Sequence, residues 1–161
     1  MGEQSVRLVL VESLKRLEFL PYLVMADESE SVVKEYIADG QMFAVIVGAE
    51  SVAGVALFVE ESADVVELKN IGLDPQFRGH GVGKKVIDLA FDIFKEQGFR
   101  RMIVGTANSS IANLAFYQKA GFRMVGIRKD FFLKYPEPIF EDGIQALDMV
   151  VFERELQEGD R

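Results

Sequence analysis

A glycine-rich stretch over residues 78–85 is the part of the sequence whose spacing points most clearly to chemistry. It reads Arg78-Gly79-His80-Gly81-Val82-Gly83-Lys84-Lys85. Glycine lets the main chain adopt a positive φ and approach a ligand closely. A helix that begins inside such a turn leaves its first N–H groups without partners, and these groups, together with the helix dipole, bind phosphate oxygens. The stretch therefore predicts a site for a phosphate-bearing ligand, to which three bases add positive charge.

Two common phosphate-binding motifs do not fit this stretch. A dinucleotide-binding turn needs G-x-G-x-x-G after the first strand, whereas the glycines here follow G-x-G-x-G after the fourth expected strand. A nucleoside-triphosphate loop needs Gly-Lys followed by Ser or Thr, whereas Gly83-Lys84 is followed by Lys85. A flexible loop between a strand and a helix is the alternative without a ligand. Three alternating glycines beside three bases favour the phosphate site.

Composition excludes several kinds of catalysis. The chain has no cysteine, which rules out disulfides, thiolate metal sites and a cysteine nucleophile. Its single histidine, His80, supports neither a structural zinc site nor a histidine-based triad. Within a phosphate-binding turn we expect His80 to face solvent or the phosphates rather than act as a base. We therefore expect chemistry without a metal.

The net charge of −8 restricts the choice of partners. An acidic protein repels nucleic-acid backbones, so neither DNA nor RNA is expected as a partner. The charge favours a cationic substrate, although solubility is the more common role of surface charge. The longest apolar runs, residues 42–47 and 52–59, are far shorter than the ~20 residues of a membrane span. The first five residues lack the features of a signal peptide, so we expect a cytoplasmic protein without a membrane partner.

The elements that position these residues follow from hydrophobic periodicity. The expected strands are residues 6–11, 42–47, 52–60, 65–73, 101–105, 122–127 and 144–153. The expected helices start at Ser13 until Pro21 interrupts, at Ser31 and Glu35 until Gly40, at Val82 until Gly98, and at Ser109 or Ser110 until Ala120. Residues 130–143 are expected to be irregular. This order predicts a layered α/β domain with a mostly antiparallel sheet.

Two motifs in register resemble the GNAT superfamily of N-acetyltransferases. Residues 73–83, LDPQFRGHGVG, are similar to its acetyl-CoA-binding motif [Q/R]-x-x-G-x-[G/A], with Arg78, Gly81 and Gly83 at the defining positions. Residues 113–122, NLAFYQKAGF, are similar to its Y-x-K-x-G-F segment. The order of elements also matches, so the resemblance covers nearly the whole chain. The stretch from Asn108 to Asp148 further resembles a bacterial branch of uncharacterised acetyltransferases.

The resemblance implies a fold and an activity. The fold would be a single α+β acetyltransferase domain over residues 1–156, followed by a polar tail over 157–161, with about seven strands in a mixed, mostly antiparallel sheet and about four flanking helices. The activity would be transfer of an acetyl group from acetyl-CoA to a primary amine of a small molecule or peptide, by direct attack in a ternary complex. A non-catalytic acyl-CoA sensor and a nucleotide-binding protein are the alternatives. The family also makes a homodimer or higher homo-oligomer an expected form.

The resemblance implies catalytic roles for two residues. The superfamily commonly uses the tyrosine of the second motif as general acid, which implies that Tyr117 protonates the leaving thiolate. Its alternative role is that of a half-buried aromatic. Glu67 lies on an apolar strand, where the pKa of a carboxyl is raised, and its place resembles that of the base glutamate in histone-acetyltransferase relatives. A surface glutamate on an exposed sheet face is the equally weighted alternative.

Cofactor contacts are also implied by the resemblance. The backbone N–H of Leu73 would polarise the thioester carbonyl near a divergence between its strand and the next, and Asn113 would hold the pantetheine arm. The full expected set is Leu73, Arg78, Gly79, His80, Gly81, Val82, Gly83, Lys84, Asn108, Asn113 and Tyr117. Residues 130–143 mix aromatic and acidic side chains, which fits a pocket for an amphipathic amine, a packed loop or a subunit contact equally.

Overall fold

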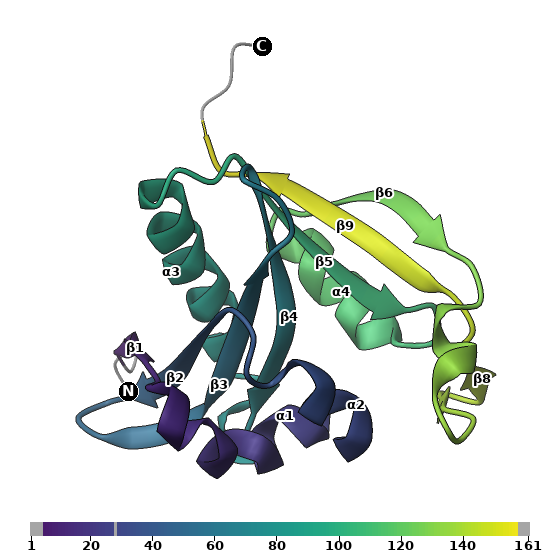
Figure 1. Cartoon of the computed structure of the whole chain (residues 1–161), viewed down its shortest axis with the longest axis horizontal. Coiled ribbons are helices and arrows are strands. Elements are labelled where there is room, and N and C mark those ends of the chain that lie inside the picture. Colours follow the sequence, from purple (N-terminus) through teal and green to yellow (C-terminus); the bar gives the residue numbers. More distant parts are fainter. Residues whose placement is uncertain (1–4, 28, 158–161) are drawn as a thin grey trace.

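The computed structural model describes residues 5–27 and 29–157. Within them, seven strands form one sheet in the order β1-β2-β3-β4-β5-β9-β6 (Figure 1). Their bounds are β1 Val6–Leu10, β2 Gln41–Val47, β3 Ser51–Glu60, β4 Val65–Leu73, β5 Arg101–Ala107, β6 Arg123–Arg128 and β9 Met149–Glu155. The β4 and β5 strands run parallel, and every other neighbouring pair in this sheet is antiparallel. The expectation of a mixed, mostly antiparallel sheet is confirmed.

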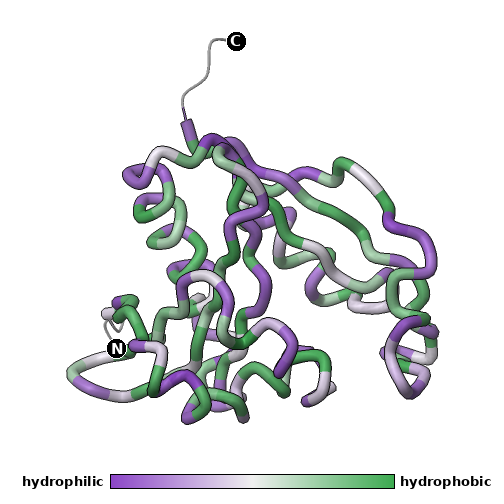
Figure 2. The backbone as a smooth tube through the Cα atoms, viewed as in Figure 1, coloured by the Kyte–Doolittle hydropathy of each residue, from purple (hydrophilic) through white to green (hydrophobic). Residues whose placement is uncertain are grey.

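Helices cover both faces of the sheet, and each face has its own hydrophobic core. The α-helices are α1 Leu20–Asp27, α2 Glu30–Tyr36, α3 Val82–Glu96 and α4 Ile111–Lys119. Side chains of α1 and α2 pack against one face, and side chains of α3 and α4 belong to the core on the other (Figure 1). Hydrophobic residues follow much of the central strands, whereas hydrophilic residues gather in the turns (Figure 2). This layering matches the number of helices expected from the sequence.

The start of the chain differs from the prediction at a proline. The expected helix from Ser13 to Pro21 is instead a 3₁₀ helix, η1 Ser13–Phe19, that leads directly into α1. Pro21 is the second residue of α1, so it begins a helix rather than ending one. The missing N–H of proline is not needed in a first turn, and its fixed φ suits a helix start.

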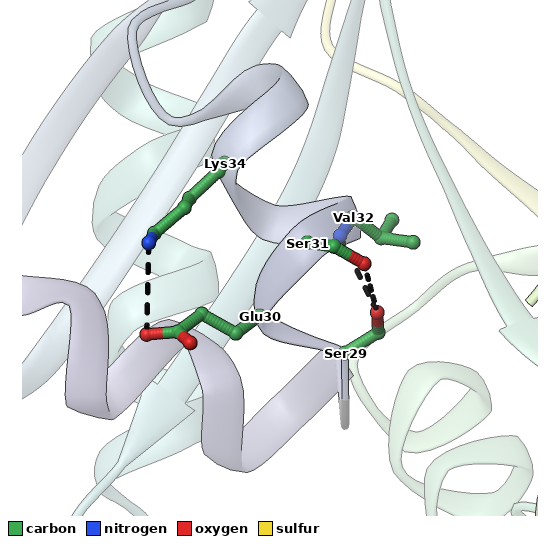
Figure 3. Close-up of polar contacts among 5 residues, drawn as sticks. All are labelled: Ser29, Glu30, Ser31, Val32 and Lys34. Atoms are coloured by element: carbon green, nitrogen blue, oxygen red, sulfur yellow. Dashed lines mark hydrogen bonds and ion pairs between the residues drawn. The ribbon is translucent and has the colours of Figure 1, made fainter. Parts of the chain in front are cut away.

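The cap of α2 also differs from the prediction by two residues. Its N-cap is Ser29, whose hydroxyl oxygen accepts the N–H of Val32 at 3.3 Å (Figure 3). Ser31 lies inside the helix, with its hydroxyl 3.1 Å from that of Ser29. An exposed pair between Lys34 and Glu30 spans one turn of the same helix at 4.0 Å. Either serine fits the capping pattern, because both precede the apolar residues of the helix.

Arg16 fixes the end of α2 against the sheet. Its buried guanidinium donates to the backbone carbonyl oxygens of Ile37 at 3.1 Å, Asp39 at 2.6 Å and Gly40 at 2.6 Å. These carbonyls follow the last turn of the helix, where backbone acceptors lack helical partners. Gly40 has φ +58°, and a Cβ there would lie 2.0 Å from the carbonyl oxygen of Phe58. This end of the helix therefore has a fixed place, and it carries Tyr36.

The last expected strand, residues 144–153, is broken in two. Its first residues form β8 Ile144–Gln145, which pairs with β7 Phe140–Glu141 in a separate hairpin, and β9 starts at Met149. The break falls at residues 146–148, where the side-chain oxygen of Asn108 accepts the N–H groups of Leu147 and Asp148. Residues 130–143, expected to be irregular, hold a 3₁₀ turn, η3 Phe131–Lys134, and half of the hairpin.

The ends of the chain reach beyond the described residues. Of the expected tail over 157–161, Gln157 is described, and its side-chain amide donates to the carbonyl oxygens of Lys95 and Phe99. Residues 158–161 lie outside the described part, as do residues 1–4. The expected division at residue 156 stays a prediction. Within residues 5–27 and 29–157, no helix combines the length and the apolar character that crossing a membrane requires.

Candidate active site

The β4 and β5 strands separate partway along their length. They pair from Val65 to Leu68 on β4 and from Arg101 to Val104 on β5, and beyond these residues they no longer pair with each other (Figure 1). A bulge accompanies the divergence, because Lys69 has no partner in the register between β3 and β4. Bulges re-aim side chains and end pairing. The second half of β4 therefore has backbone groups with no strand opposite them.

The backbone N–H of Leu73 points into this gap. The next residue, Asp74, donates its N–H to the carbonyl oxygen of Ala53 on the β3 side at 2.7 Å. Because successive N–H groups of a strand point to opposite sides, that of Leu73 points away from β3. The Leu73 carbonyl oxygen, on the same side, accepts a hydrogen bond from Nε of Arg78 at 3.0 Å. The N–H is thus left to face the gap as a donor.

The glycine-rich turn follows directly and is open on its outer side. Gly79 and Gly81 have φ of +79° and +77°, and a Cβ at either position would meet nothing within 4 Å. Gly81 is the N-cap of α3 and makes no side-chain cap bond. The first helical bond runs from the N–H of Lys85 to the carbonyl oxygen of Gly81 at 3.2 Å. The N–H groups of the first turn are therefore free to bind an anion.

The remaining residues of the turn have different surroundings. Val82 is buried in the core, whereas His80 and Lys84 are exposed. Arg78 is exposed too, but its guanidinium bends back to Leu73 and comes within 4.0 Å of the sulfur of Met25. Among the described residues, no hydrogen bond or ion pair engages the exposed side chains of His80 and Lys84.

Tyr117 lies on α4 in an apolar environment. Its side chain is 6% exposed, and its ring contacts those of Phe116, Phe122 and Phe152. Burial raises the pKa of the phenol above its ordinary value, so the hydroxyl stays protonated at neutral pH. Across residues 5–27 and 29–157, no group forms a hydrogen bond with this hydroxyl. A protonated phenol without a partner has the properties that a general acid needs.

The two asparagines predicted to contact the coenzyme have different surroundings. Asn113 is exposed on α4, one turn before Tyr117, and its Nδ2 lies 3.4 Å from Oγ1 of Thr106 on β5. Asn108 follows β5 and accepts the backbone N–H groups of the 147–148 loop at 2.8 and 3.1 Å, while it donates to the carbonyl oxygen of Gln145 at 3.1 Å. A ligand could therefore replace the single weak contact of Asn113, whereas the side chain of Asn108 already makes three hydrogen bonds within the protein.

Glu67 lies on β4, on the opposite face of the sheet from α3 and α4. It is half-buried between Val59 on β3 and Ile103 on β5. Burial is the largest influence on its carboxyl and raises the pKa above the ordinary value. Lys69, Arg128 and Lys134 act against that rise, and Glu61 adds to it. The carboxyl is therefore a stronger proton acceptor than an exposed glutamate.

Sequence reasoning missed a polar network on the same face. The Tyr36 hydroxyl donates to Oδ2 of Asp27 and accepts from Nδ2 of Asn70 at 2.8 Å. The other Asp27 oxygen accepts the hydroxyl of Tyr135 at 2.5 Å. Burial and the neighbouring carboxylate raise the pKa of Tyr36. The polar Asn70 on an apolar strand was a signal in the sequence that could have pointed to this network. No local pattern, however, indicates that Tyr135 contacts Asp27, 108 positions earlier.

Metal ligands do not gather at this site. Across the described ranges, no group of three or more His, Asp or Glu side chains is placed to hold a metal ion. The groups described above are backbone N–H donors, the buried phenol of Tyr117 and the half-buried carboxyl of Glu67. These are groups for binding anionic oxygens and for moving protons.

Comparisons with known proteins agree with this geometry. The model of the acetyltransferase (GNAT) family matches residues 11–122. An uncharacterised N-acetyltransferase of Bacillus subtilis, YvbK, is 38% identical over 151 residues, which cover 93% of this chain and 96% of that protein. Both observations extend over most of the chain, so the match is not confined to the two short motifs.

Solved structures of similar proteins contain the coenzyme. A Bacillus subtilis acetyltransferase in complex with CoA has a TM-score of 0.86 at 36% identity, covering 95% of this chain and 100% of that one. A GNAT family acetyltransferase from Elizabethkingia anophelis with acetyl-CoA bound has a TM-score of 0.83 at 28% identity, covering 96% and 99%. The chain belongs to the GNAT family of acetyltransferases and uses acetyl-CoA as its cosubstrate.

Proposed function

We propose that the enzyme transfers the acetyl group to a primary amine of a small molecule or peptide, by direct attack within a ternary complex. The arrangement of groups around the gap between β4 and β5 is the main support for this proposal. The gap between β4 and β5 is reached by the N–H of Leu73, lies beside the open turn at the start of α3, and has the half-buried Glu67 at its closed end. Acceptor and donor can therefore approach from opposite faces of the sheet.

The turn would bind the pyrophosphate of the coenzyme. The N–H groups at Gly79, Gly81 and the first turn of α3 are the donors, and the exposed Lys84 and His80 lie beside them. An uncapped helix start combines free donors with the positive end of the helix dipole. Asn113 would give up its 3.4 Å contact to hold the pantetheine arm. The absence of any atom within 4 Å of an added Cβ at both glycines supports a close approach by phosphate.

Three groups would share the chemistry. An amine with a pKa near ~10.4 must lose a proton before it attacks, and Glu67 would accept it, directly or through water. The Leu73 N–H would stabilise negative charge on the carbonyl oxygen of the acetyl group as the amine attacks. Tyr117 would protonate the leaving sulfur. Each role matches a property of its group: a carboxyl whose pKa is raised by burial, an outward N–H and a buried neutral phenol.

Asn108 has a different place in this proposal. Its contacts with the 145–148 loop support a role in shaping the acceptor side rather than in binding the coenzyme. Arg78, whose guanidinium turns back to Leu73, would hold the end of β4 in position. Both assignments depart from the family-based expectation and are tested by the affinity for CoA.

Two measurements test the function. Calorimetry with CoA and with acetyl-CoA should show binding to one site per chain. Release of free thiol from acetyl-CoA should then depend on an added amine, with acetylated amine identified by mass spectrometry. Tight CoA binding without thiol release from any amine would instead favour the sensor module. No heat with either form of the coenzyme would remove the proposed site.

A further inference from the structure

Three basic side chains lie within electrostatic reach of Glu67, in a chain whose net charge is −8. Lys69 comes from the β4 bulge, Arg128 from the end of β6 and Lys134 from η3, and each interacts electrostatically with the Glu67 carboxyl. Within residues 5–27 and 29–157, none of the three has a carboxylate oxygen within 4.0 Å of its side-chain nitrogen atoms. The three bases therefore approach Glu67 without a close carboxylate partner of their own.

Ring contacts hold two of these bases, Lys69 and Lys134, in place. Nζ of Lys69 lies 5.2 Å from the centre of the Tyr36 ring. Tyr36 is bound to Asp27, which also accepts the hydroxyl of Tyr135. Lys134 directly precedes Tyr135, and its Nζ lies 4.1 Å above the ring of Phe131. The network thus joins the residue that follows Lys134 to α1 and α2, which pack on the same face of the sheet as Glu67.

A buried amide oxygen nearby has no partner. Asn70 follows Lys69 and is 6% exposed. Its Nδ2 donates to the carbonyl oxygen of Leu23 at 2.9 Å and to the hydroxyl oxygen of Tyr36 at 2.8 Å. Its Oδ1 is buried and accepts no hydrogen bond within the described part of the chain. Native proteins rarely leave a buried acceptor unpaired, so this oxygen points to a donor that the protein itself does not supply.

We propose that the acceptor carries an anionic group, carboxylate or phosphate, in addition to its amine, and that Lys69, Arg128 and Lys134 bind this group while the amine faces Glu67 and Asn70. The inference rests on the proposed amine acetylation and names its acceptor class. An anionic group would supply the counter-charge that the three bases lack. A polyamine would place further positive charge beside them and leave them unpaired.

Matched acceptors test the inference. One pair is an α-amino acid and its amide, and a second pair is glucosamine 6-phosphate and glucosamine, so that carboxylate and phosphate are examined separately. In at least one pair, kcat/KM should be at least tenfold higher for the anionic member. The preference should shrink as salt is added, because salt screens partly exposed charges. The charged group of the preferred pair then identifies the anion.

Variants locate the effect. Lys134→Gln and Arg128→Gln should each lower the preference for the anionic acceptor several-fold while turnover of its neutral counterpart is retained, which also shows that the variant is folded. Lys129→Gln removes the same charge from an exposed position beside Arg128 that does not act on Glu67, and it should leave the preference unchanged. An equal loss in all three variants would place the effect in the overall charge and overturn the assignment.

Three outcomes distinguish a failure of this inference from a failure of the proposed amine acetylation. Equal kcat/KM within both pairs, or a preference for spermidine over every anionic acceptor, would overturn the inference and leave amine acetylation standing. Bound CoA with no turnover of any amine would overturn the proposed function, and the inference with it. A preference that persists in the Lys134 and Arg128 variants would show that other residues bind the anion.

Discussion

Gly83 packs against the ring of Phe116, so that a Cβ at position 83 would lie 3.1 Å from the Cζ atom of that ring. Gly79 and Gly81 differ, because they combine a positive φ with open space. The three alternating glycines therefore serve two purposes. Two let the backbone form an open turn, and the third lets the first turn of α3 approach α4, where Tyr117 follows Phe116.

Replacing Gly81 should separate coenzyme binding from backbone strain. Gly81→Val forces a branched side chain into φ +77° and covers the open turn, so we expect a loss of stability of about 1–2 kcal/mol and no detectable CoA binding. Gly98→Val is the matched control, because Gly98 has φ +96° and open space but follows the other end of the 15-residue α3 helix. It should lose similar stability in denaturation and keep the calorimetric Kd. Retained affinity in the Gly81 variant would place the phosphates elsewhere.

Removing the hydroxyl of Tyr117 should affect turnover alone. If the phenol is the general acid, Tyr117→Phe lowers kcat by ~10²–10⁴-fold. The Kd for acetyl-CoA and the Tm should change little, because the hydroxyl has no hydrogen-bond partner within the described part of the chain. Tyr22→Phe makes the same change on α1 and should leave kcat unaltered. Because burial raises the pKa of Tyr117, any alkaline fall in rate due to it should begin above pH ~10. An unchanged kcat in the Tyr117 variant would remove it from the mechanism.

Glu67 should set the acidic limb of the pH–rate profile. A base acts when deprotonated, so kcat/KM should rise with pH through a pKa above the ordinary value of about 4.3. Glu67→Gln should abolish this limb and lower kcat/KM by ~10²–10⁴-fold at neutral pH. Glu60→Gln, at an exposed carboxylate on the neighbouring strand β3, should retain both limb and rate. A limb that persists in the Glu67 variant would assign the base to another group.

The same pKa shift predicts a change in stability with pH. The folded state holds the Glu67 proton to a higher pH than the unfolded chain does, so between the two pKa values the folded state binds more protons. The free energy of unfolding should therefore fall as the pH rises through this interval and stay lower above it. Denaturation of the wild type and the Glu67→Gln variant between pH 4 and 8 should show this contribution in the wild type only.

Local patterns account for most of the fold that the sequence predicts. The strands β2, β3 and β4 lie within one residue of their expected bounds, because a run of apolar residues between turn residues needs no distant information. Two of the differences from the prediction have distinct causes. A proline can stand at the start of a helix or follow the end of one, so the sequence pattern around Pro21 does not decide between the two. The break at residues 146–148 depends on Asn108, some 40 positions earlier.

The two halves of the site differ in the same way. The proposed coenzyme side is nearly continuous in sequence, from Leu73 to Lys84, and a motif points to it. The proposed acceptor side joins Asp27, Tyr36 and Tyr135 through side-chain hydrogen bonds between distant segments. No local spacing encodes such contacts, and the tertiary arrangement is needed to find them. Glu67 could be chosen as a candidate base from the sequence because a charged residue on an apolar strand is itself a local signal.

Asn108 and Asn113 should give opposite kinetic signatures. Asn108→Ala leaves the N–H groups of Leu147 and Asp148 without their acceptor, which costs about 1–3 kcal/mol of stability. The N–H of Phe132 donates to Leu147 and that of Asp130 to Asp148, so the loss also loosens the η3 turn that carries Lys134. We expect a higher KM for the acceptor and an unchanged Kd for CoA.

Asn113→Ala removes an exposed amide with one 3.4 Å contact, so its stability should change by less than about 0.5 kcal/mol. If it holds the pantetheine arm, the Kd for CoA rises while the acceptor KM is retained. Steady-state kinetics with calorimetry distinguish the two variants. If Asn108→Ala instead weakens CoA binding and leaves the acceptor KM unchanged, Asn108 contacts the coenzyme. A loosened η3 turn cannot produce that result, because it lies on the opposite face of the sheet from the coenzyme.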